Sequence, residues 1–492
     1  MNDTLLHLQN GSDIRGVAIP HDDVKATLTP DVVRKIGAAF AEHVKAKRNK
    51  AEITVAVGHD SRISAKEMFD NFCTGATSRG AQITYTGLSS TPAMFMSTIL
   101  EGYEYDAGVM ITASHLPYDR NGFKFFTREG GFEKSDIKAI LTNAADISVR
   151  DEKCSFRERD IMAAYSEFLR RVIIKKAGIG DTPLAGLHVI IDAGNGAGGF
   201  FETQVLQPLG ASTHGSIFTT PDGTFPNHAP NPEDKTAMKI FSEAVVREKA
   251  DLGIIFDTDV DRAAVVLSDG SEINRNKLIA LMTAIVMQEH EKPVIVTDSV
   301  TSTGLAEFIT NHGGIHRRFK RGYRNVINEA IRMCNEGHDA CLAIETSGHG
   351  AMRENFFLDD GAYMAALITA QLAKAHAQNK RISDLIADLK EPAEAEEIRL
   401  KINTEDFAAY GESVLAALKE RVEKEDGLTL APDNFEGVRV NADKNHGDGW
   451  FLLRLSLHDP VLPLNIESNS MGGVEIIRNW INAFLSGFDK LS

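Results

Sequence analysis

A strand-like segment that ends in a polar loop occurs three times in this chain and constrains its fold more than any other feature. The three copies are YDAGVMITASH (105–115), ADLGIIFDTDVDR (250–262) and HDACLAIETSGH (338–349). Ligands bind outside the carboxyl ends of strands in α/β sheets, so the repeat predicts three loops that converge on one cleft. Buried strands that merely end in polar turns are the competing explanation.

Equivalent positions of the three loops carry chemically useful side chains. Counting six and eight residues from the first aspartate of each copy gives, in chain order, Thr112 and Ser114, Asp257 and Asp259, and Glu345 and Ser347. Hydroxyl and carboxylate groups at matching loop positions indicate one shared polar site.

Short apolar runs followed by longer amphipathic stretches recur up to about residue 380, which is typical of mostly parallel α/β domains. The runs at 53–62, 187–199 and 293–304 are each expected to open a domain. After Pro392 the pattern changes. We expect a strand over 396–403 and a helix to about Lys424, then short strands around Val438, Phe451 and Leu464, and a closing helix from about Gly473.

These patterns predict an α/β protein with three similar mixed-sheet domains and a smaller C-terminal α+β domain around a central cleft. The expected ranges are 1–155 with the TASH loop, 156–266 with the DTDVDR loop, 267–390 with the ETSGH loop, and 391–492. A length of 492 residues agrees with several domains, since one domain typically holds about 100–200 residues.

Composition excludes several classes of protein. A formal charge of -16 disfavours a nucleic-acid or anionic-membrane binder, because such proteins need a cationic face. Four cysteines without C-x-x-C spacing are expected to be reduced thiols. The first residues, MNDTLLHLQN, lack the basic and apolar regions of a signal peptide, and no apolar stretch is long enough for a membrane span. A cytoplasmic protein is therefore expected.

The second loop has the character of a metal site. Asp257, Asp259 and Asp261 offer hard carboxylate oxygens within five residues, which suits Mg2+. An EF-hand does not fit, because its sixth position is Arg262 instead of glycine and its twelfth is Ser268 instead of glutamate. A solvated acidic turn is the alternative explanation. The arginine is either an ion-pair partner of the aspartates or a cation that faces a phosphate.

The first loop carries a serine that could act as a nucleophile. Ser114 is followed by His115, but neighbours in sequence are not thereby placed to exchange a proton, and most such pairs are ordinary loop residues. The turn NGFK (121–124) brings Lys124 close behind the loop. A role for Ser114 as a nucleophile is favoured because the equivalent loop holds the three aspartates.

Two further motifs leave alternatives open. Gly194, Gly196 and Gly199 have the G-x-G-x-x-G spacing of a dinucleotide site, but no convincing strand-ending acid follows, so close packing is the favoured interpretation. Five cations crowd into a short segment, where they form either a phosphate-attracting site or a solvated basic face: Arg317, Arg318, Lys320, Arg321 and Arg324.

Taken together, these motifs resemble those of the α-D-phosphohexomutase superfamily, which includes phosphoglucomutase, phosphomannomutase and phosphoglucosamine mutase. TASHLP resembles its phosphoserine loop, DTDVDR its magnesium loop and ETSGH its sugar-binding loop, in the family's order. GSDIRG near the start and GHDSR at 58–62 resemble its first-domain signatures. The resemblance covers essentially the whole chain and implies three similar α/β domains and a smaller fourth one.

The resemblance also implies roles for individual residues. Ser114 carries the phosphoryl group and, with Asp257, Asp259 and Asp261, holds Mg2+. Arg262 partners the phosphoserine, His115 and Lys124 are candidates for proton transfer, and Arg15 contacts substrate or phosphate. The substrate-binding residues it implies, together with one taken from the basic segment, are Glu345, Ser347, His349, Arg321, Arg454, Ser456 and His458.

One segment departs from the family pattern. The phosphate loop of the family reads like RPSGTEP, whereas this chain has RLSLHDP at 454–460. Leu457 in place of glycine removes easy access to positive φ and adds bulk, so the loop is expected to hold the distal phosphate in an altered way. Leu116 stands where the family usually has asparagine.

The expected reaction interconverts hexose 1-phosphate and hexose 6-phosphate, of glucose, mannose or both, by two phosphoryl transfers through a hexose 1,6-bisphosphate, which also serves as activator. A phosphoglucosamine mutase is the alternative within the class. A serine-dependent sugar phosphatase and a non-catalytic sugar phosphate binder are alternatives from other classes. The expected partners are small hexose phosphates, without nucleic acid or membrane, and the chain is expected to be a monomer or homodimer.

Overall fold

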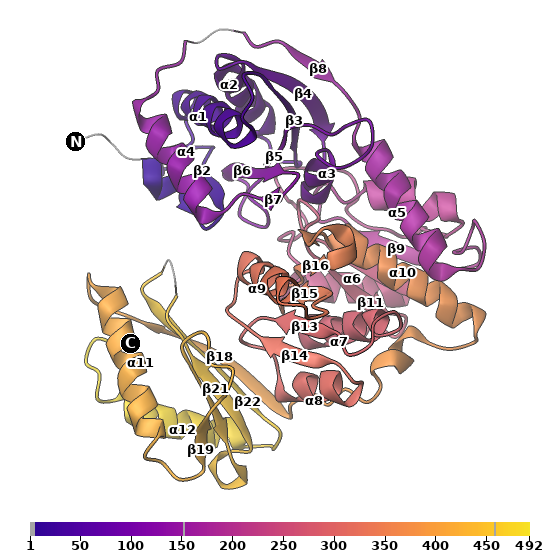
Figure 1. The fold of residues 1–492 in the computed structure, drawn as a ribbon. Helices are drawn as coiled ribbons and strands as arrows, with labels where there is room; N and C mark the ends of the chain where they lie inside the picture. Colours follow the sequence, from indigo (N-terminus) through magenta and orange to yellow (C-terminus); the bar gives the residue numbers. More distant parts are fainter. Residues whose placement is uncertain (1–4, 151–152, 457–458) are drawn as a thin grey trace. The chain divides into compact units, whose positions relative to one another are not determined.

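The computed structural model of the protein describes residues 5–150, 153–456 and 459–492, and Figure 1 shows their arrangement. The chain forms two compact units. Unit 1 comprises Met1–Asn274 and Ser347–Asp384, and unit 2 comprises Arg275–Thr346 and Leu385–Ser492. The polar loop at 338–349 therefore crosses from unit 2 into unit 1. The four domain ranges expected from the sequence stay a prediction.

The first sheet of unit 1 is mixed. Its strands are β1 (Gln9–Asn10), β2 (Asp13–Val17), β3 (Ile53–His59), β4 (Ala81–Leu88), β5 (Ala107–Ile111), β6 (Arg120–Thr127), β7 (Gly130–Gly131) and β8 (Phe156–Glu158). The order is β1-β2-β6-β5-β3-β4-β8, with β7 paired to β6. β3 is parallel to β4 and β5, whereas β6 is antiparallel to β5 and β2. The TASH loop follows β5, at the carboxyl end of a central parallel strand.

The helices around this sheet are η1 (Leu5–Leu8), α1 (Pro30–Arg48), α2 (Ala65–Thr77), α3 (Thr91–Met96) and α4 (Lys134–Asp146), and α5 (Met162–Ala177) follows them in the chain. α1 begins where the Thr29 side chain accepts a hydrogen bond from the backbone of Val32, with Pro30 in the first turn. α1 and α2 approach closely: a Cβ on Gly75 would lie 1.9 Å from the Arg34 carbonyl oxygen. Stacked phenylalanines fill the core, among them Phe40, Phe72, Phe123 and Phe125.

The second sheet of unit 1 presents the acidic loop. Its strands are β9 (Val189–Asp192), β10 (Leu252–Phe256), β11 (Ala263–Leu267) and β12 (Glu272–Ile273), and η2 (Phe201–Leu206), η3 (Gln207–Leu209) and α6 (Lys235–Glu248) belong to the same part. β10 runs parallel to β9 and antiparallel to β11. Residues 257–262 connect β10 to β11 and contain the three aspartates. Ile190, Phe241 and Ile255 belong to the apolar core beneath them.

The returning segment completes unit 1. It contains β16 (Gly350–Met352), η4 (Arg353–Asn355), β17 (Leu358–Asp359) and α10 (Gly361–Ala377), and η5 (Ile382–Ile386) follows. α10 packs against α5. The Tyr165 hydroxyl of α5 donates to Asp360 Oδ1 at 2.6 Å, and the Tyr363 amide donates to the same oxygen at 2.8 Å. Asn355 donates to the other oxygen at 2.9 Å. A buried carboxyl group thus caps α10 and joins it to α5.

The titration of Asp360 gives a test of this joint. Burial raises its pKa to about 6, although its hydrogen bonds oppose that shift. Between the ordinary value of 3.8 and about 6 the folded state keeps a proton that the unfolded state has lost, so this group stabilises the fold less as pH rises. The neutral Asp360→Asn should therefore gain up to about 3 kcal/mol relative to wild type between about pH 4 and 7.

Calorimetry of wild type and Asp360→Asn across this pH range measures the effect on the melting temperature. Asp181→Asn, which replaces an exposed acid of the same unit, is the matched control. A difference between Asp360→Asn and wild type that does not change with pH would contradict the raised pKa.

Unit 2 begins with a parallel α/β part. Its strands are β13 (Val294–Thr297), β14 (Ile315–Arg318) and β15 (Leu342–Ile344), and its helices are α7 (Arg275–Val286), α8 (Thr303–Asn311) and α9 (Tyr323–Asn335). β13 lies between β14 and β15 and is parallel to both. Their carboxyl ends therefore share one edge, at which Asp298 and Glu345 follow β13 and β15.

The C-terminal part of unit 2 is an antiparallel sheet with helices. Its elements are β18 (Glu394–Lys401), α11 (Phe407–Val422), β19 (Leu428–Leu430), β20 (Val438–Ala442), η6 (Lys444–His446), β21 (Gly449–Leu453), β22 (Val461–Ser468) and α12 (Gly473–Leu485). The strand order is β18-β22-β21-β20-β19. Apolar side chains of α11, α12 and the sheet form one core. This confirms the expected α+β domain and its closing helix.

Buried polar contacts join the two parts of unit 2. Arg439 donates to the carbonyl oxygens of Ser299 at 2.8 Å and Thr301 at 3.0 Å. Arg318 and Asp433 form an ion pair at 2.6 Å. Because these groups lie largely out of water, the contacts fix the C-terminal sheet on the α/β part of this unit.

The three runs expected to open domains contain the strands β3, β9 and β13, but β1 and β2 precede β3 in the same sheet, so the first run does not open it. The four cysteines, all of which lie in the described part of the chain, are free thiols. None of the helices within residues 5–150, 153–456 and 459–492 has the length and apolar character that crossing a membrane requires.

Candidate active site

The backbone at Ser114 is strained. Its φ is +52°, a conformation that a residue other than glycine adopts only when its surroundings enforce it. The Ser114 amide donates to Thr112 Oγ1 at 2.9 Å, and that hydroxyl donates to Asp60 Oδ2 at 2.7 Å. The side chain is buried. Strain of this kind at a single buried serine is typical of a group that is held for chemistry.

Arg62 holds the TASH loop in place. Its Nη2 donates to the carbonyl oxygens of Ser114 and Leu116, both at 2.6 Å, and its Nη1 donates to those of Pro117 at 2.6 Å and Arg120 at 2.9 Å. Its Nε donates to Asp60 at 3.2 Å, and both side chains are fully buried. One planar guanidinium thus fixes the backbone from the serine to Arg120.

The Arg62–Asp60 pair lies in an environment that disfavours charge. Burial lowers the pKa of Arg62, and burial raises the pKa of Asp60 even though Arg62 opposes that shift. Each charge therefore depends on the other. Asp60 and Arg62 belong to the GHDSR segment, which resembles a first-domain signature of the family, and their role here is to hold the TASH loop.

Removal of the Arg62 side chain should lower the stability of the protein and the order of the TASH loop. Arg62→Met leaves Asp60 buried and unpaired and frees four loop carbonyls, so we expect a loss of about 3–5 kcal/mol. Hydrogen exchange of the 112–120 peptide and the denaturation midpoint measure this effect. Arg62→Lys keeps the charge but loses the planar set of donors. Its denaturation midpoint should therefore lie between those of Arg62→Met and wild type. Arg128→Met, at an exposed arginine of the same unit, is the control; equal protection in Arg62→Met and this control would refute the clamp.

The loop between β10 and β11 collects three buried carboxylates. Carboxylate oxygens of Asp257, Asp259 and Asp261 lie within 4.8 Å of one another. Asp259 Oδ1 and Asp261 Oδ1 are buried and have no hydrogen-bond partner among the described residues. Buried carboxylate oxygens without donors are costly, whereas a hard divalent cation accepts this donor set. The loop therefore fits Mg2+ chemically.

The charges around this loop are arranged unevenly. Burial, followed by the charges of Asp261 and Asp259, raises the pKa of Asp257 well above its ordinary value. Burial acts on Asp261 in the same direction, but Lys124, His349 and Arg262 outweigh it and lower the pKa of that carboxyl. Burial and the neighbouring carboxylates thus disfavour the charged form of Asp257, whereas the neighbouring cations favour the charged form of Asp261.

Lys124 and Thr91 contact the acidic loop from the first sheet. Lys124 Nζ lies 2.9 Å from Asp259 Oδ2 and also forms an ion pair with Asp261. The Thr91 hydroxyl donates to Asp259 Oδ2, and the Thr91 amide donates to the Asp259 carbonyl at 2.8 Å. The two sheets of unit 1 are therefore joined at this loop, and Lys124 lies at the site as the sequence predicted.

The serine meets the acidic loop directly. Ser114 Oγ donates to Asp257 Oδ2 at 3.1 Å and accepts from Arg262 Nη2 at 2.9 Å. Arg262 Nε donates to the same Asp257 oxygen at 3.1 Å. The convergence expected from the repeat is thus confirmed for the first two loops, which bring a hydroxyl, a carboxylate and a guanidinium to one point.

His115 is close to the serine but is directed toward Arg262. Its Nδ1 lies 3.3 Å from Ser114 Oγ and accepts from Arg262 Nη2. Burial, together with Arg262 and Arg15, lowers the pKa of His115 to about 2, so the imidazole is neutral at pH 7. Arg15 donates to Asp13 at 2.9 Å and is partly buried. The role of His115 in proton transfer stays a prediction.

The end of the third loop contacts the acidic loop within unit 1. His349 pairs with Asp359, and its Nδ1 lies 3.9 Å from Asp261 Oδ1. Burial opposes ionisation, but Asp359 and Asp261 prevail and raise the pKa of His349 to about 9, so it is a cation at neutral pH. Ser347 is buried in the same unit. The structure thus places His349 against the aspartates, and its expected role toward the sugar stays a prediction.

Two predicted arginines of unit 2 gather around one glutamate. The Arg321 amide donates to Glu436 Oε2 at 3.0 Å, and Arg454 Nη1 lies 3.7 Å from Glu436 Oε1. Glu345 accepts from the Gly322 amide at 2.5 Å. Burial lowers the pKa of Arg454, although Glu436 opposes that shift. Glu436 thus contacts the Arg321 backbone and the Arg454 guanidinium, while Arg321 Nε lies 3.9 Å from Asp298 Oδ2.

The segment RLSLHDP (454–460), which departs from the family pattern, joins β21 to β22. Arg454 donates from its backbone to the Pro463 carbonyl at 3.1 Å, and Ser456 donates to that of Val461 at 3.0 Å. The Asp459 amide donates to Ser456 Oγ at 3.3 Å. His458, a predicted substrate-binding residue, lies outside the described residues.

The remaining motifs have structural contacts. A Cβ on Gly196 would lie 2.6 Å from the Thr258 carbonyl oxygen, so the glycine run packs directly under the acidic loop. In the basic segment, Arg317 pairs with Glu329 at 2.7 Å, in addition to the Arg318–Asp433 pair. These two arginines thus stabilise unit 2, while the Arg321 side chain lies near Asp298.

Sequence reasoning missed several contributors to the site: Asp60, Arg62, Thr91, Asp359 and Glu436. Most of them act through contacts between distant segments, and Asp359 acts on His349 ten residues before it. Only the GHDSR resemblance marked any of them in the sequence.

Known proteins resemble this chain over nearly its whole length. The chain matches the family models for phosphoglucomutase/phosphomannomutase alpha/beta/alpha domains I, II and III over residues 7–150, 163–270 and 274–392. A phosphomannomutase/phosphoglucomutase of Pseudomonas syringae pv. tomato is 30% identical over 475 residues, which cover 96% of this chain and 94% of the relative.

Further relatives carry related names. A phosphoglucomutase of Neisseria gonorrhoeae is 29% identical over 477 residues, with coverage of 96% of this chain and 95% of the relative. The crystal structure of a phosphoglucomutase/phosphomannomutase family protein from Burkholderia thailandensis superposes with a TM-score of 0.80 at 26% identity and covers 99% of this chain and 98% of that one.

Proposed function

The chain belongs to the phosphoglucomutase/phosphomannomutase family and is a hexose phosphate mutase, an isomerase, and from that premise we propose that Ser114 carries the phosphoryl group it moves. The observation that carries this proposal is the position of Ser114 Oγ between Asp257 at 3.1 Å and Arg262 at 2.9 Å. A phosphoryl group on this oxygen has a guanidinium beside it and the carboxylate cluster within reach.

We further propose that Asp257, Asp259 and Asp261 hold Mg2+ together with the phosphate on Ser114. The support is the hard donor set and the two buried carboxylate oxygens that lack hydrogen-bond partners in the described chain. When bound, Mg2+ supplies charge neutralisation at the transferring phosphoryl group. Lys124 and His349 balance the same carboxylates with their positive charges.

The reaction consists of two phosphoryl transfers. In the first, a free hydroxyl of a hexose monophosphate forms a bond to phosphorus while the bond from phosphorus to Ser114 Oγ breaks, which yields a hexose 1,6-bisphosphate. In the second, Ser114 Oγ takes back the other phosphoryl group, and the isomeric monophosphate leaves. Arg262 stabilises the charge on the phosphoryl oxygens in both steps.

Each transfer also moves one proton from the attacking hydroxyl and returns one to the leaving oxygen. We propose that Lys124 exchanges this proton, because its Nζ is buried at the carboxylate cluster and comes from the strand beside the TASH loop. His115 accepts a hydrogen bond from Arg262 and is proposed to orient that guanidinium toward Ser114. A hexose 1,6-bisphosphate would phosphorylate Ser114 at the start and so act as activator.

The non-reacting end of the substrate needs its own recognition. We propose that Arg321, Arg454 and Ser456 bind the distal phosphate, because Glu436 contacts both the Arg321 backbone and the Arg454 guanidinium and the serine lies in the β21–β22 loop. By family resemblance, Glu345 and Ser347 are proposed to bind sugar hydroxyls. Arg15 is proposed to contact the phosphate beside Ser114.

An assay of the purified chain tests the function. Glucose 1-phosphate or mannose 1-phosphate is supplied with Mg2+ and a trace of the matching 1,6-bisphosphate, and hexose 6-phosphate and free phosphate are measured together. We expect isomerisation without release of phosphate, and the ratio of the two rates identifies the preferred sugar. Release of phosphate without isomerisation would instead assign a phosphatase. If the protein converts only glucosamine phosphate, its substrate is the amino sugar.

A further inference from the structure

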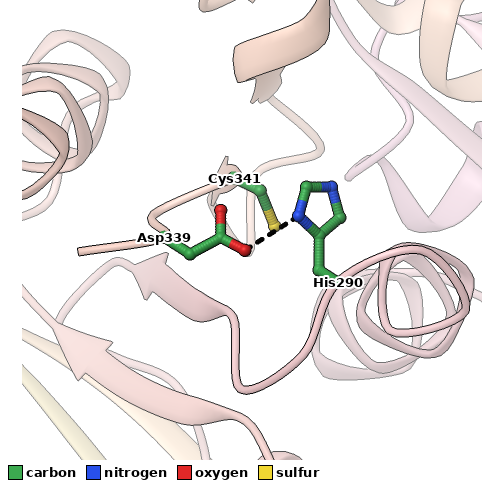
Figure 2. Close-up of side chains that lie close together, drawn as sticks. All are labelled: His290, Asp339 and Cys341. Carbon is green, nitrogen blue, oxygen red and sulfur yellow. Dashed lines mark hydrogen bonds and ion pairs between the residues drawn. The ribbon is translucent and has the colours of Figure 1, made fainter. Parts of the chain in front are cut away.

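Three side chains with metal-binding atoms lie together in unit 2, and the proposed reaction uses none of them. His290, Asp339 and Cys341 each offer one ligand atom, and these atoms lie within 4.8 Å of one another. His290 Nδ1 and Asp339 Oδ2 are 2.9 Å apart. Figure 2 shows the Cys341 sulfur beside this pair, with all three groups directed toward one point.

Rigid elements hold the cluster. His290 lies in the turn between α7 and β13, whereas Asp339 and Cys341 lie between α9 and β15. The Val294 amide donates to the Asp339 carbonyl at 2.8 Å, and the Cys341 amide donates to the same carbonyl at 3.1 Å. Cys341 directly precedes β15 and is 2% exposed. The backbone thus fixes two of the three ligand positions against the start of a strand.

The cluster lies at the opposite edge of the sheet from the residues proposed to bind substrate. β13 and β15 are parallel, and the cluster lies at their amino ends. Asp298 and Glu345 follow the carboxyl ends of the same strands. The cluster is therefore separate from the sugar-binding positions of unit 2.

The chemistry of the donors selects a class of metal. One imidazole nitrogen, one carboxylate oxygen and one sulfur form the mixed set that Zn2+ accepts, whereas Mg2+ prefers oxygen alone. Zinc bonds of about 2.0–2.3 Å place tetrahedral ligand atoms about 3.3–3.8 Å apart. The present spacing needs only small side-chain rotations to reach those values. His290 and Asp339 are 22% and 32% exposed, so the fourth position is open to water.

We propose that His290, Asp339 and Cys341 form a Zn2+ site with water as the fourth ligand. The thiol of Cys341 loses its proton when the metal binds. The bound ion ties the α7–β13 turn to the start of β15 and stabilises this edge of the sheet. Because the site differs in donors from the three aspartates of unit 1, it binds its metal in the presence of Mg2+.

Cobalt titration of the full chain tests the proposal. Co2+ replaces Zn2+ at such sites, and a thiolate ligand adds a charge-transfer band in the near ultraviolet that oxygen ligands do not give. Excess Mg2+ occupies the carboxylate cluster of unit 1 during the titration. We expect the band to saturate at a single equivalent of Co2+ per chain and to disappear when Zn2+ displaces the cobalt.

Variants assign the ligands. Cys341→Ser should abolish the band, and His290→Gln should weaken Co2+ binding at least about tenfold, since ligand loss costs more than loss of a supporting group. Cys334→Ser is the matched control, because Cys334 lies in the same region and its thiol donates to the Ala340 carbonyl at 3.3 Å. This control should keep the band and its affinity.

Two results would overturn the site: wild-type protein without a thiolate band, or a band that survives in Cys341→Ser. Mutase activity with Mg2+ and the melting temperature without added Zn2+ or Co2+ establish that each variant is folded, and both should stay at the wild-type level. If Cys341→Ser does not fold, His290→Gln decides alone, and unchanged Co2+ affinity in that variant refutes the proposal. A failed mutase assay would leave the cobalt result unaffected.

Discussion

Ser114→Ala should lower kcat of hexose phosphate isomerisation by about 10^4-fold or more while the protein stays folded. The reaction has no other route in this account, because the phosphoryl group must bond to Ser114 Oγ between the two transfers. Alanine removes a hydroxyl that donates to Asp257 and accepts from Arg262, and it leaves the backbone contacts of Arg62 in place. The loop should therefore keep its conformation.

Initial rates with saturating substrate and Mg2+ measure this effect. Ser135→Ala replaces an exposed serine of α4 in the same unit and should keep full activity. Hydrogen exchange of the 112–120 peptide verifies that the loop remains ordered in Ser114→Ala. Activity within tenfold of wild type in a folded Ser114→Ala protein would exclude Ser114 as the phosphoryl carrier.

The second large effect is expected at the carboxylate cluster. Asp259→Asn keeps the shape of the side chain but removes one of three charges that the proposed cation requires. A metal ion at a transferring phosphoryl group contributes several kcal/mol, so about 4 kcal/mol and about 10^3-fold in kcat should be lost. The contacts of Asp259 with Lys124 and Thr91 would also weaken.

The dependence of the rate on Mg2+ separates a metal ligand from a structural residue. In Asp259→Asn the Mg2+ concentration for half-maximal activity should rise, and removal of the metal by a chelator should abolish the remaining activity. Asp269→Asn, at an exposed turn between β11 and β12, is the control and should behave as wild type. Full activity of wild type in the chelator would contradict a metal at this site.

Much of the fold was predictable because the chain repeats one simple pattern. Apolar runs such as 53–57 and 252–256 are long enough for a buried strand, and polar residues follow each run. The ends of the strands and the loops could therefore be predicted from the sequence. The C-terminal sheet was predicted from the change of pattern after Pro392 and from short apolar segments. The return of residues 347–384 to unit 1 was not predicted. It depends on which surfaces pack together, and the local sequence does not reveal that.

The site was predictable where chemistry is local. Three aspartates in five residues indicate a cation, and the equivalent loop led to Ser114. Arg62 was not predicted as the clamp, because it lies 52 residues from the serine whose carbonyl it holds. Glu436 was missed for the same reason, since it brings Arg321 and Arg454 together from two parts of unit 2. Such contacts exist only after folding.

The most direct test of the central claim is the mass of the 112–124 peptide after reaction with hexose 1,6-bisphosphate and after a subsequent chase with hexose monophosphate. The account predicts that one phosphoryl group is found on Ser114 after the first step, and that it leaves the peptide and enters the sugar during the chase. A peptide that never gains the phosphoryl group while isomerisation proceeds, or one that keeps it through the chase, would contradict the account.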